Sequence, residues 1–306
     1  MSSSRSRVAL VTGASSGIGR ATAVALADAG FVTYATARCF ESVADLAARG
    51  LPTLPLDVAA ESSMVAAVAA VEAAHGAVEL LVNNAGYGLM GPLEELSVND
   101  VRRQFETNVF GLLRMAQLVL PGMRRAGRGR IVNVGSVGGL FTAPGAAAYH
   151  MSKYAVESLT DGLRYEVRDF GVEVVLIQPT GVRTAFIDKQ ISTLPDTGDD
   201  GPYAAFKHNL AAGARRLFDV PVPGIVVSPE RVAQVIVEAA EAKRPRTRYK
   251  VGASAHLLPA LRRRVSDRTW DGLMARQFPA TEGRSGRVAV ASDGVGRGSE
   301  PSPGAA

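Results

Sequence analysis

Tyr149 and Lys153 are the two residues whose types and spacing point most directly to chemistry. They lie four positions apart in a stretch that predicts a helix from Tyr149 to Asp169, so both side chains are expected on one helix face. A phenol has an ordinary pKa of about 10, and a neighbouring ammonium group lowers that pKa by favouring the ionised form. The pair can therefore act as a general acid or base toward a substrate oxygen.

Two further polar residues precede this pair. Ser136 follows a strand expected at Ile131–Val134, and its hydroxyl could hold a substrate oxygen beside the phenol. Asn108 lies inside a long helix expected at Val98–Arg125, where a polar amide is mildly unfavourable and therefore suits a functional role. Each residue also has a structural alternative: Tyr149 in the core, Lys153 as a solvated charge, Ser136 as a strand cap.

A glycine-rich turn begins at Thr12, after a strand predicted at Arg7–Thr12, and opens a helix predicted at Ala21–Ala29. Glycine permits a tight turn and a close approach of the backbone to a pyrophosphate, while the helix start offers free N–H groups and a positive dipole end. This context predicts a dinucleotide site, with a purely structural turn as the alternative. The predicted contacts are Gly13, Ser15, Ser16, Gly17, Ile18 and Gly19.

The end of the second predicted strand, Phe31–Thr36, indicates which dinucleotide binds. A carboxylate that would hold the adenosine ribose is absent there, and Arg38 follows instead. The planar guanidinium group matches phosphate oxygens, so the sequence favours NADP(H) over NAD(H). The alternative for Arg38 is an ordinary solvated charge.

Polar residues also follow the next two predicted strands, Thr53–Leu56 and Glu79–Val82. Ligands of open α/β sheets bind at such carboxyl ends. Asp57 could accept a hydrogen bond from an adenine amino group, or it could cap the helix that begins near Ala60. The residues assigned to the cofactor here are Asp57, Val58, Asn84, Ala85 and Gly86.

Together these motifs resemble the short-chain dehydrogenase/reductase family. The matches are the glycine turn, Asp57, Asn83-Asn84-Ala85-Gly86, Asn108, Ser136 and the Tyr149–Lys153 pair, in the family's order and spacing. The resemblance implies hydride transfer between a nicotinamide and a carbonyl carbon, with Tyr149 handling the proton. It also implies that Lys153 binds the nicotinamide ribose and that Asn108 anchors a proton-relaying water. Some stretches, such as Ala85–Gly88, are similar to the branch around 17β-hydroxysteroid dehydrogenase.

One segment departs from the family pattern. Thr180 follows Pro179 after the sixth predicted strand, Glu173–Gln178, where the family commonly has a glycine that lets the backbone approach the nicotinamide. Thr184 matches the family position that bonds the carboxamide or the diphosphate. The resemblance therefore assigns this segment to the cofactor through Pro179, Thr180, Val182 and Thr184.

The alternation of strands and helices predicts an α/β, doubly wound Rossmann fold with a parallel seven-stranded sheet and helices on both faces. We expect one oxidoreductase domain over residues 7–278, a flexible N-terminus over 1–6 and a disordered tail over 279–306. We expect Pro121 and Gly122 to disturb the last turns of the helix predicted at Val98–Arg125.

A substrate lid is expected over about residues 182–227. Its apolar side chains suit a hydrophobic ketone or alcohol, or else form helix core or subunit contacts: Phe186, Ile187, Ile191, Leu194, Tyr203, Phe206, Leu210, Leu217 and Phe218. Residues 243–264 carry eight basic side chains and no acid, which indicates a solvated face or an attraction to an anionic surface.

Composition narrows the remaining possibilities. The 306-residue chain has 47% hydrophobic residues, a net charge of +5 and one cysteine, Cys39. We therefore expect a cytoplasmic homo-oligomer, a dimer or tetramer, without disulfides, a metal site, a membrane span or a nucleic-acid partner.

The sequence predicts an NADP(H)-dependent enzyme that interconverts a ketone and a secondary alcohol. A catalytically silent nucleotide-binding regulatory protein of the same fold is the alternative. A third possibility is isomerisation or dehydration on the same fold.

Overall fold

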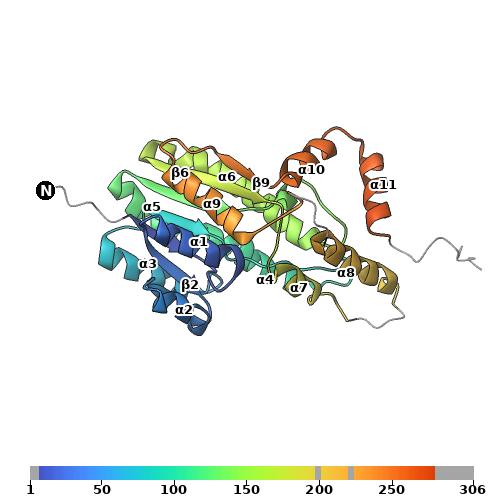
Figure 1. Ribbon diagram of the computed structural model, residues 1–306, viewed down its shortest axis with the longest axis horizontal. Coiled ribbons are helices and arrows are strands. Elements are labelled where there is room, and N and C mark those ends of the chain that lie inside the picture. The colour runs from blue at the N-terminus through green and yellow to red at the C-terminus, as the bar shows by residue number, and fades with distance from the viewer. Residues whose placement is uncertain (1–6, 197–200, 220–223, 280–306) are drawn as a thin grey trace, which may run out of the picture.

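Seven short strands form one parallel sheet in the computed structural model of the protein, which describes residues 7–196, 201–219 and 224–279 (Figure 1). The predicted flexible N-terminus and all but Pro279 of the predicted tail lie outside the described residues. In spatial order the strands are β3 (Thr53–Pro55), β2 (Val32–Ala37), β1 (Val8–Val11), β4 (Leu80–Asn83), β5 (Gly129–Val134), β6 (Val172–Pro179) and β9 (Arg248–Val251). This arrangement confirms the predicted Rossmann fold.

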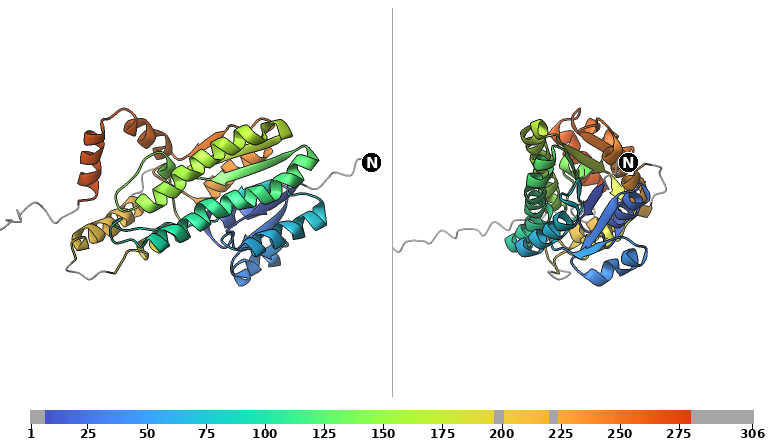
Figure 2. Two further views of the ribbon diagram at one scale, coloured as in Figure 1. Left: turned by 180° about the vertical axis from the view of Figure 1, so that it is seen from behind. Right: turned by 90° about the vertical axis from the view of Figure 1, so that its left-hand side faces the viewer.

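Side chains alternate between the two faces of the sheet, as the period of a strand requires. In β1, Ala9 and Val11 pack with one group of helices, whereas Val8 and Leu10 pack with the other. The first face is covered by α1 (Gly17–Asp28), α2 (Ala44–Ala48) and α9 (Pro229–Glu241). The second is covered by α3 (Glu61–His75), α5 (Gly111–Ala126) and α6 (Ala147–Val167), and Figure 2 shows the resulting three layers.

The long helix predicted at Val98–Arg125 is present, but its irregularity lies elsewhere than expected. Helix α4 (Val98–Phe105) passes into a π-helical segment, Glu106–Phe110, before α5 begins. Pro121 lies inside α5, which continues to Ala126 without interruption. A π-helical segment inside an α-helix is frequent at functional sites, and this one contains Asn108.

Apart from α9 and β9, which complete the main sheet layers, the elements after β6 form a separate group beyond the carboxyl end of the sheet (Figure 1). Two short parallel strands, β7 (Gly181–Val182) and β8 (Val226–Val227), pair with each other at the base of the lid segment. The segment expected to be a lid is helical, which the sequence did not indicate. Its helices are α7 (Phe186–Ile191) and α8 (Ala204–Asp219), and α10 (Ser254–Arg262) and α11 (Asp267–Gln277) follow β9.

Candidate active site

The strand order reverses between β1 and β4, and the glycine-rich turn lies at this switch point. The hydroxyl of Thr12, at the end of β1, accepts the backbone N–H groups of Asn84 at 2.9 Å and Ala85 at 3.0 Å. The Asn84 amide returns hydrogen bonds to the carbonyls of Thr12 at 3.0 Å and Gly13 at 3.2 Å. These bonds fix the turn onto the end of β4. Thr12 was not among the predicted site residues, although it begins the motif.

The glycines of this turn are required by close approach of neighbouring atoms. Gly13 has a φ of +69°, and a Cβ there would lie 2.9 Å from the Ala85 Cα. Gly17 has a φ of +55° and would place a Cβ 3.0 Å from the methyl group of Thr184. The fold therefore brings the predicted cofactor residue Thr184 onto the turn from a distant part of the chain.

The start of α1 has the features of an anion site. Ser15 and Ser16 are exposed, and Ser16 caps α1 without a side-chain hydrogen bond to the helix. The first N–H groups of a helix have no intrahelical partner and, with the positive dipole end, attract a phosphate. Ile18, half-buried behind the turn, packs against the core on this face of the sheet. These residues fit the diphosphate of a dinucleotide.

Arg38 lies just past the end of β2 and is exposed. Among the described residues, none forms an ion pair with its guanidinium group. Its neighbour Arg20 differs in this respect, because it pairs with Asp45. Arg38 therefore has its donors available for an anion at the carboxyl edge of the sheet.

Asp57 and Val58 have structural contacts of their own. The Asp57 carboxylate accepts the backbone N–H of Ala59 at 3.0 Å, whereas the residue that caps α3 is Ala60. The alternative in which Asp57 caps that helix was therefore wrong, because its hydrogen bond lies in the turn before the helix. Val58 is buried against Gly111, where a Cβ would come within 2.3 Å of the Val58 carbonyl oxygen.

The catalytic candidates meet at the carboxyl end of β5. Ser136 follows that strand, and its hydroxyl accepts the Gly138 N–H at 3.0 Å and hydrogen-bonds the Tyr149 side chain. The Lys153 ammonium donates to the Val134 carbonyl at 2.9 Å and lies 5.8 Å from the centroid of the Tyr149 ring. The structure thus places Ser136, Tyr149 and Lys153 in one group, as their spacing predicted.

Burial has the largest effect on the pKa values of Tyr149 and Lys153. Burial raises the pKa of the Tyr149 phenol above its ordinary value of 10.0, and the hydrogen bond with Ser136 lowers it only in part. Burial also lowers the pKa of Lys153 from 10.5 to about 8, because it removes water from the ammonium group. The pKa of Tyr149 is therefore raised where a lowered value was expected, because burial is the largest effect on the phenol.

Asn108 is almost fully buried in the π-helical segment, and its side chain is fully engaged with backbone and hydroxyl groups. Its amide donates to the Tyr87 carbonyl at 2.9 Å and to the Ser152 hydroxyl at 3.0 Å, and its oxygen accepts the Tyr87 N–H at 3.0 Å. The Ser152 hydroxyl donates in turn to the Tyr149 carbonyl at 2.7 Å. Asn108 therefore joins the loop after β4 to the helix that carries Tyr149.

Gly86 lies at this contact between the loop after β4 and the π-helical segment. A Cβ at Gly86 would lie 3.0 Å from the Asn108 side-chain oxygen, so the loop after β4 can only approach α4 and the π-helical segment because this residue is glycine. Asn83, which precedes the predicted residues, has a structural role. Its amide donates to Asn133 at 3.0 Å, and Asn133 donates to Thr160 at 3.0 Å, which links β4, β5 and α6 through the core.

His150 is a supporting residue that the sequence did not single out. It is buried, and its Nδ1 atom hydrogen-bonds the Gly138 carbonyl at 2.7 Å. Burial lowers its pKa, and hydrogen bonds to backbone groups raise it in part. His150 holds the segment after Ser136 against α6, one position from Tyr149. The only sequence signal was its adjacency to the tyrosine.

Thr180, the departure from the family pattern, has a clear structural role. Its hydroxyl donates to the Ile225 carbonyl at 2.9 Å and hydrogen-bonds the Ser254 hydroxyl. A Cβ at Gly252 would lie 2.4 Å from the Thr180 methyl group. Thr180 therefore ties the end of β6 to the strand β8 region and to the start of α10, while Pro179 is buried in β6 and Val182 pairs with Val227 in the small sheet.

Most of the lid's apolar side chains pack on one another. Met90, Leu210 and Ala214 form a buried cluster, and around it lie Ile187, Ile191, Leu194, Phe206 and Phe278. Five of the residues considered as substrate contacts therefore follow the other expectation and pack in the core of this segment: Ile187, Ile191, Leu194, Phe206 and Leu210. The side chains of Leu217 and Phe218 lie outside the described residues. Phe186 differs, because its ring lies 5.6 Å from that of Tyr149 and therefore faces the catalytic group.

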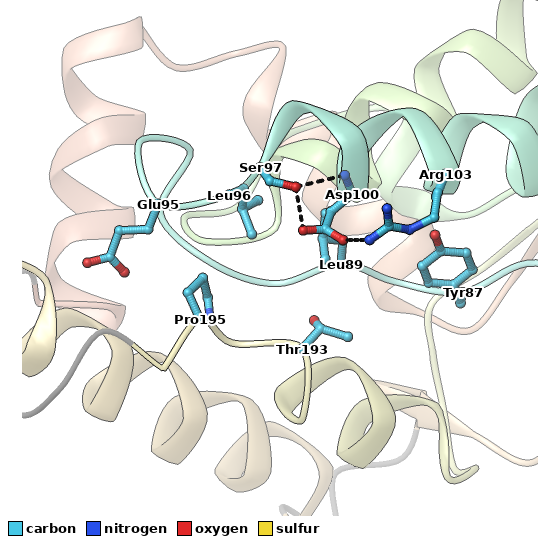
Figure 3. A pocket seen from close by; sticks show the side chains of 9 residues that line it. All are labelled: Tyr87, Leu89, Glu95, Leu96, Ser97, Asp100, Arg103, Thr193 and Pro195. Carbon is cyan, nitrogen blue, oxygen red and sulfur yellow. Dashed lines mark hydrogen bonds and ion pairs between the residues drawn. The ribbon is translucent and has the colours of Figure 1, made fainter.

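A pocket of about 410 Å³ lies between the lid and the loop after β4 (Figure 3). Leu89, Leu96 and Pro195 give it apolar walls, and an ion pair between Asp100 and Arg103 lies on its other side. Tyr87, whose backbone Asn108 holds, also lines it. Neither Ser136 nor Tyr149 lines this pocket, so Tyr87 is its link to the group around Asn108.

The basic stretch 243–264 is not one free charged face. Arg248 pairs with Glu157 at 3.2 Å and Asp161 at 2.6 Å, and Arg262 pairs with Asp267 at 2.5 Å. Within residues 7–196, 201–219 and 224–279, no helix is long and apolar enough to cross a bilayer. The same residues contain no group of three His, Cys, Asp or Glu side chains placed to hold a metal ion.

Comparison with known proteins identifies the family. Residues 7–194 match the family described as short chain dehydrogenase. Human 17-beta-hydroxysteroid dehydrogenase type 1 is 38% identical over 274 residues, which cover 85% of this chain and 81% of that protein. The chain therefore belongs to the short-chain dehydrogenase/reductase family, whose members use nicotinamide cofactors.

Solved structures agree with this assignment. A short-chain dehydrogenase from Streptomyces avermitilis matches with a TM-score of 0.72 and 33% identity, over 89% of this chain and 98% of that chain. A serine dehydrogenase in its closed form, complexed with NADP+, matches with a TM-score of 0.69 and 26% identity, over 80% of this chain and 94% of that chain. The protein is thus an oxidoreductase of the class that acts on CH–OH or C=O groups.

Proposed function

We propose that the protein is an NADP(H)-dependent enzyme that interconverts a hydrophobic ketone and the corresponding secondary alcohol, with Tyr149 as general acid or base. The observation that carries the proposal is the group formed by Ser136, Tyr149 and Lys153 at the carboxyl end of β5. The end of the same sheet carries the glycine turn, which has the features of a diphosphate site.

NADP(H) is proposed on the surroundings of Arg38. Its exposed guanidinium group forms no ion pair with any described residue, and it lies at the strand end where the adenosine ribose is held in this fold. An arginine fork donates two parallel hydrogen bonds to a phosphate, which suits a 2′-phosphate. The related serine dehydrogenase was solved with NADP+, which supports the same choice.

The bound nicotinamide supplies the hydride in reduction and accepts it in oxidation. In reduction, Tyr149 donates its phenolic proton to the carbonyl oxygen, and Ser136 holds that oxygen by a hydrogen bond. Lys153 keeps a positive charge beside the phenol as the proton leaves, which stabilises the developing phenolate. Asn108 holds the Tyr87 segment and, through Ser152, the backbone of Tyr149 in register. That Asn108 also binds a water that relays protons remains a prediction.

A hydrophobic substrate is proposed on the walls around Tyr149. Phe186 faces the catalytic ring, and the adjoining pocket has Leu89, Leu96 and Pro195 in its walls. The human relative is named for a hydroxysteroid, which is a substrate of this class. The proposal includes the segment 182–227 as the lid over this substrate, in a domain spanning 7–278.

We also propose a homo-oligomer that associates through α6 and the π-helical segment. Phe110, Met151 and Tyr154 are 51%, 47% and 44% exposed, and the two elements pack together through Val109 and Val156. Large exposed apolar side chains on adjacent elements are typical of an interface. A cytoplasmic location, expected for a chain with one cysteine, stays a prediction.

A screen of hydrophobic ketones with NADPH, and of secondary alcohols with NADP+, tests the function by the absorbance of the reduced nicotinamide. For a confirmed substrate, Tyr149→Phe should reduce kcat at least about 100-fold, the scale of a lost general acid. Tyr165→Phe is a matched control, because Tyr165 lies on the same helix and is 67% exposed. Unaltered turnover in Tyr149→Phe contradicts the assignment of the proton donor. Tight cofactor binding without turnover across the screen would favour the silent regulatory protein.

A further inference from the structure

The C-terminal helix α11 is attached to the rest of the protein by aromatic side chains at two places. Most of its side chains are exposed, but Trp270 is only 4% exposed. The Trp270 ring lies edge-on to Phe141, with 5.5 Å between the ring centroids. Just past the end of the helix, Phe278 packs against the apolar cluster of the lid around Leu210.

The first attachment leads to the catalytic tyrosine. Phe141 belongs to segment 137–146, which connects Ser136 to α6. The Phe141 ring lies 6.0 Å from the ring of His150, and the His150 ring lies 5.7 Å from that of Tyr149. A continuous row of packed rings therefore connects α11 to Tyr149.

The second attachment leads to the lid helix α8. A Cβ at Gly213 would lie 3.1 Å from the Phe278 ring, and the Asn209 amide donates to the Pro279 carbonyl at 3.0 Å. Helix α8 also touches segment 137–146 directly, because a Cβ at Gly145 would lie 2.1 Å from the Leu210 side chain. Segment 137–146, α8 and α11 thus contact one another pairwise and form a closed corner. Figures 1 and 2 show this corner at the end of the molecule where α11 descends beside α8.

We propose that α11 is a strap across this corner and that Trp270 is a positioning residue for the reaction. With both attachments in place, α11 fixes segment 137–146 relative to the lid helix. It thereby fixes Ser136 and Tyr149 relative to α8. A bulky ketone is expected to contact both the Ser136–Tyr149 side and the α8 side of the site. Its binding therefore depends on the strap more than the binding of a small ketone does. The strap itself follows from the contacts alone, whereas its effect on substrate choice rests on the proposed function.

Hydrogen–deuterium exchange tests the strap without any substrate. Trp270→Ala should increase exchange both in 137–146 and in 204–219, by about twofold to tenfold, the range that corresponds to one aromatic pair. Trp270→Phe, which keeps an edge-on ring, should increase exchange less. Leu273→Ala is the matched control, because Leu273 lies on the same helix and is 38% exposed. An increase confined to α11, with the other two segments unchanged, would refute the strap.

Steady-state kinetics then test the positioning role on a confirmed pair of bulky and small ketones. In Trp270→Ala, kcat/KM for the bulky ketone should fall about tenfold, while the KM for NADPH and the values for the small ketone stay within about twofold. Equal losses for both ketones would overturn the selective role. The chain's one tryptophan is Trp270, so its fluorescence reports whether α11 stays docked in Phe278→Ala. If no ketone is turned over, the proposed function fails, while the exchange result still decides whether the strap exists.

Discussion

The buried ammonium group of Lys153 should make the catalytic site costly to the stability of the fold. The residue is 8% exposed, and burial lowers its pKa from 10.5 to about 8. This pKa difference means that the charged form of Lys153 lowers the free energy of unfolding by about 3 kcal/mol, since one pKa unit is about 1.4 kcal/mol. Lys153→Met keeps the length of the side chain and removes the charge. The Val134 carbonyl loses its donor in this variant, which costs about 1–3 kcal/mol. At pH 7 the variant should therefore range from equally stable to about 2 kcal/mol more stable.

The pH dependence of the free energy of unfolding separates the cost of the buried Lys153 charge from effects of packing. Because the folded pKa of Lys153 is lower than the unfolded one, the unfolded chain binds more protons between about pH 8 and 10.5. The free energy of unfolding of the wild type should therefore rise with pH through this window, relative to that of Lys153→Met. The wild type should have gained about 3 kcal/mol in free energy of unfolding relative to Lys153→Met once the pH exceeds the unfolded pKa of the lysine.

Urea unfolding followed by circular dichroism between pH 7 and pH 11 measures this difference. Groups that do not interact with Lys153 titrate alike in both proteins and cancel in the comparison, and Tyr149→Phe in both backgrounds removes the titration of the neighbouring phenol. Lys189→Met, which removes an exposed lysine on α7, serves as a control and should run parallel to the wild type. A constant difference between the wild type and Lys153→Met, or one that changes in the opposite direction, would refute the reasoning. The same variant should lose most of its turnover.

Two further predictions concern the cofactor and the oligomer. Arg38→Asp should weaken NADP(H) binding about 10- to 100-fold, the scale of one lost charged hydrogen bond, without weakening NAD(H) binding. Fluorescence titration with both cofactors measures this, and a retained NADP(H) preference would remove Arg38 from the 2′-phosphate site. Phe110→Glu should convert the oligomer to a smaller species in light scattering. An unchanged mass would show that this face is not the interface.

The elements of the sheet could be predicted because their signals are local. Each buried strand is a short apolar run, and the turn after β1 carries glycines that no other residue could replace. The predicted strand at Glu173–Gln178 lies within β6, and the Tyr149–Lys153 spacing placed both residues on α6. The catalytic candidates were proposed from the order of their motifs, and the fold brings Ser136, Tyr149 and Lys153 together.

The features that escaped prediction depend on distant parts of the chain. The acidity of Tyr149 and Lys153 is set by burial, which their spacing does not encode. His150 contacts Gly138 across a loop, and Trp270 contacts Phe141 across more than a hundred residues. The π-helical segment likewise has no periodicity that distinguishes it from the α-helix on either side.

Burial of Tyr149 and Lys153 also affects which protonation states are available to the proposed reaction. A raised pKa keeps Tyr149 protonated at neutral pH, which is the form that donates a proton to a ketone. Alcohol oxidation needs the opposite form, a phenolate, and burial makes that form costly. Lys153 has a pKa of about 8, so it still carries its charge at pH 7 and can stabilise the phenolate that forms as the proton leaves. Under the proposed function, the same burial that costs stability therefore suits both residues to donating a proton to a ketone.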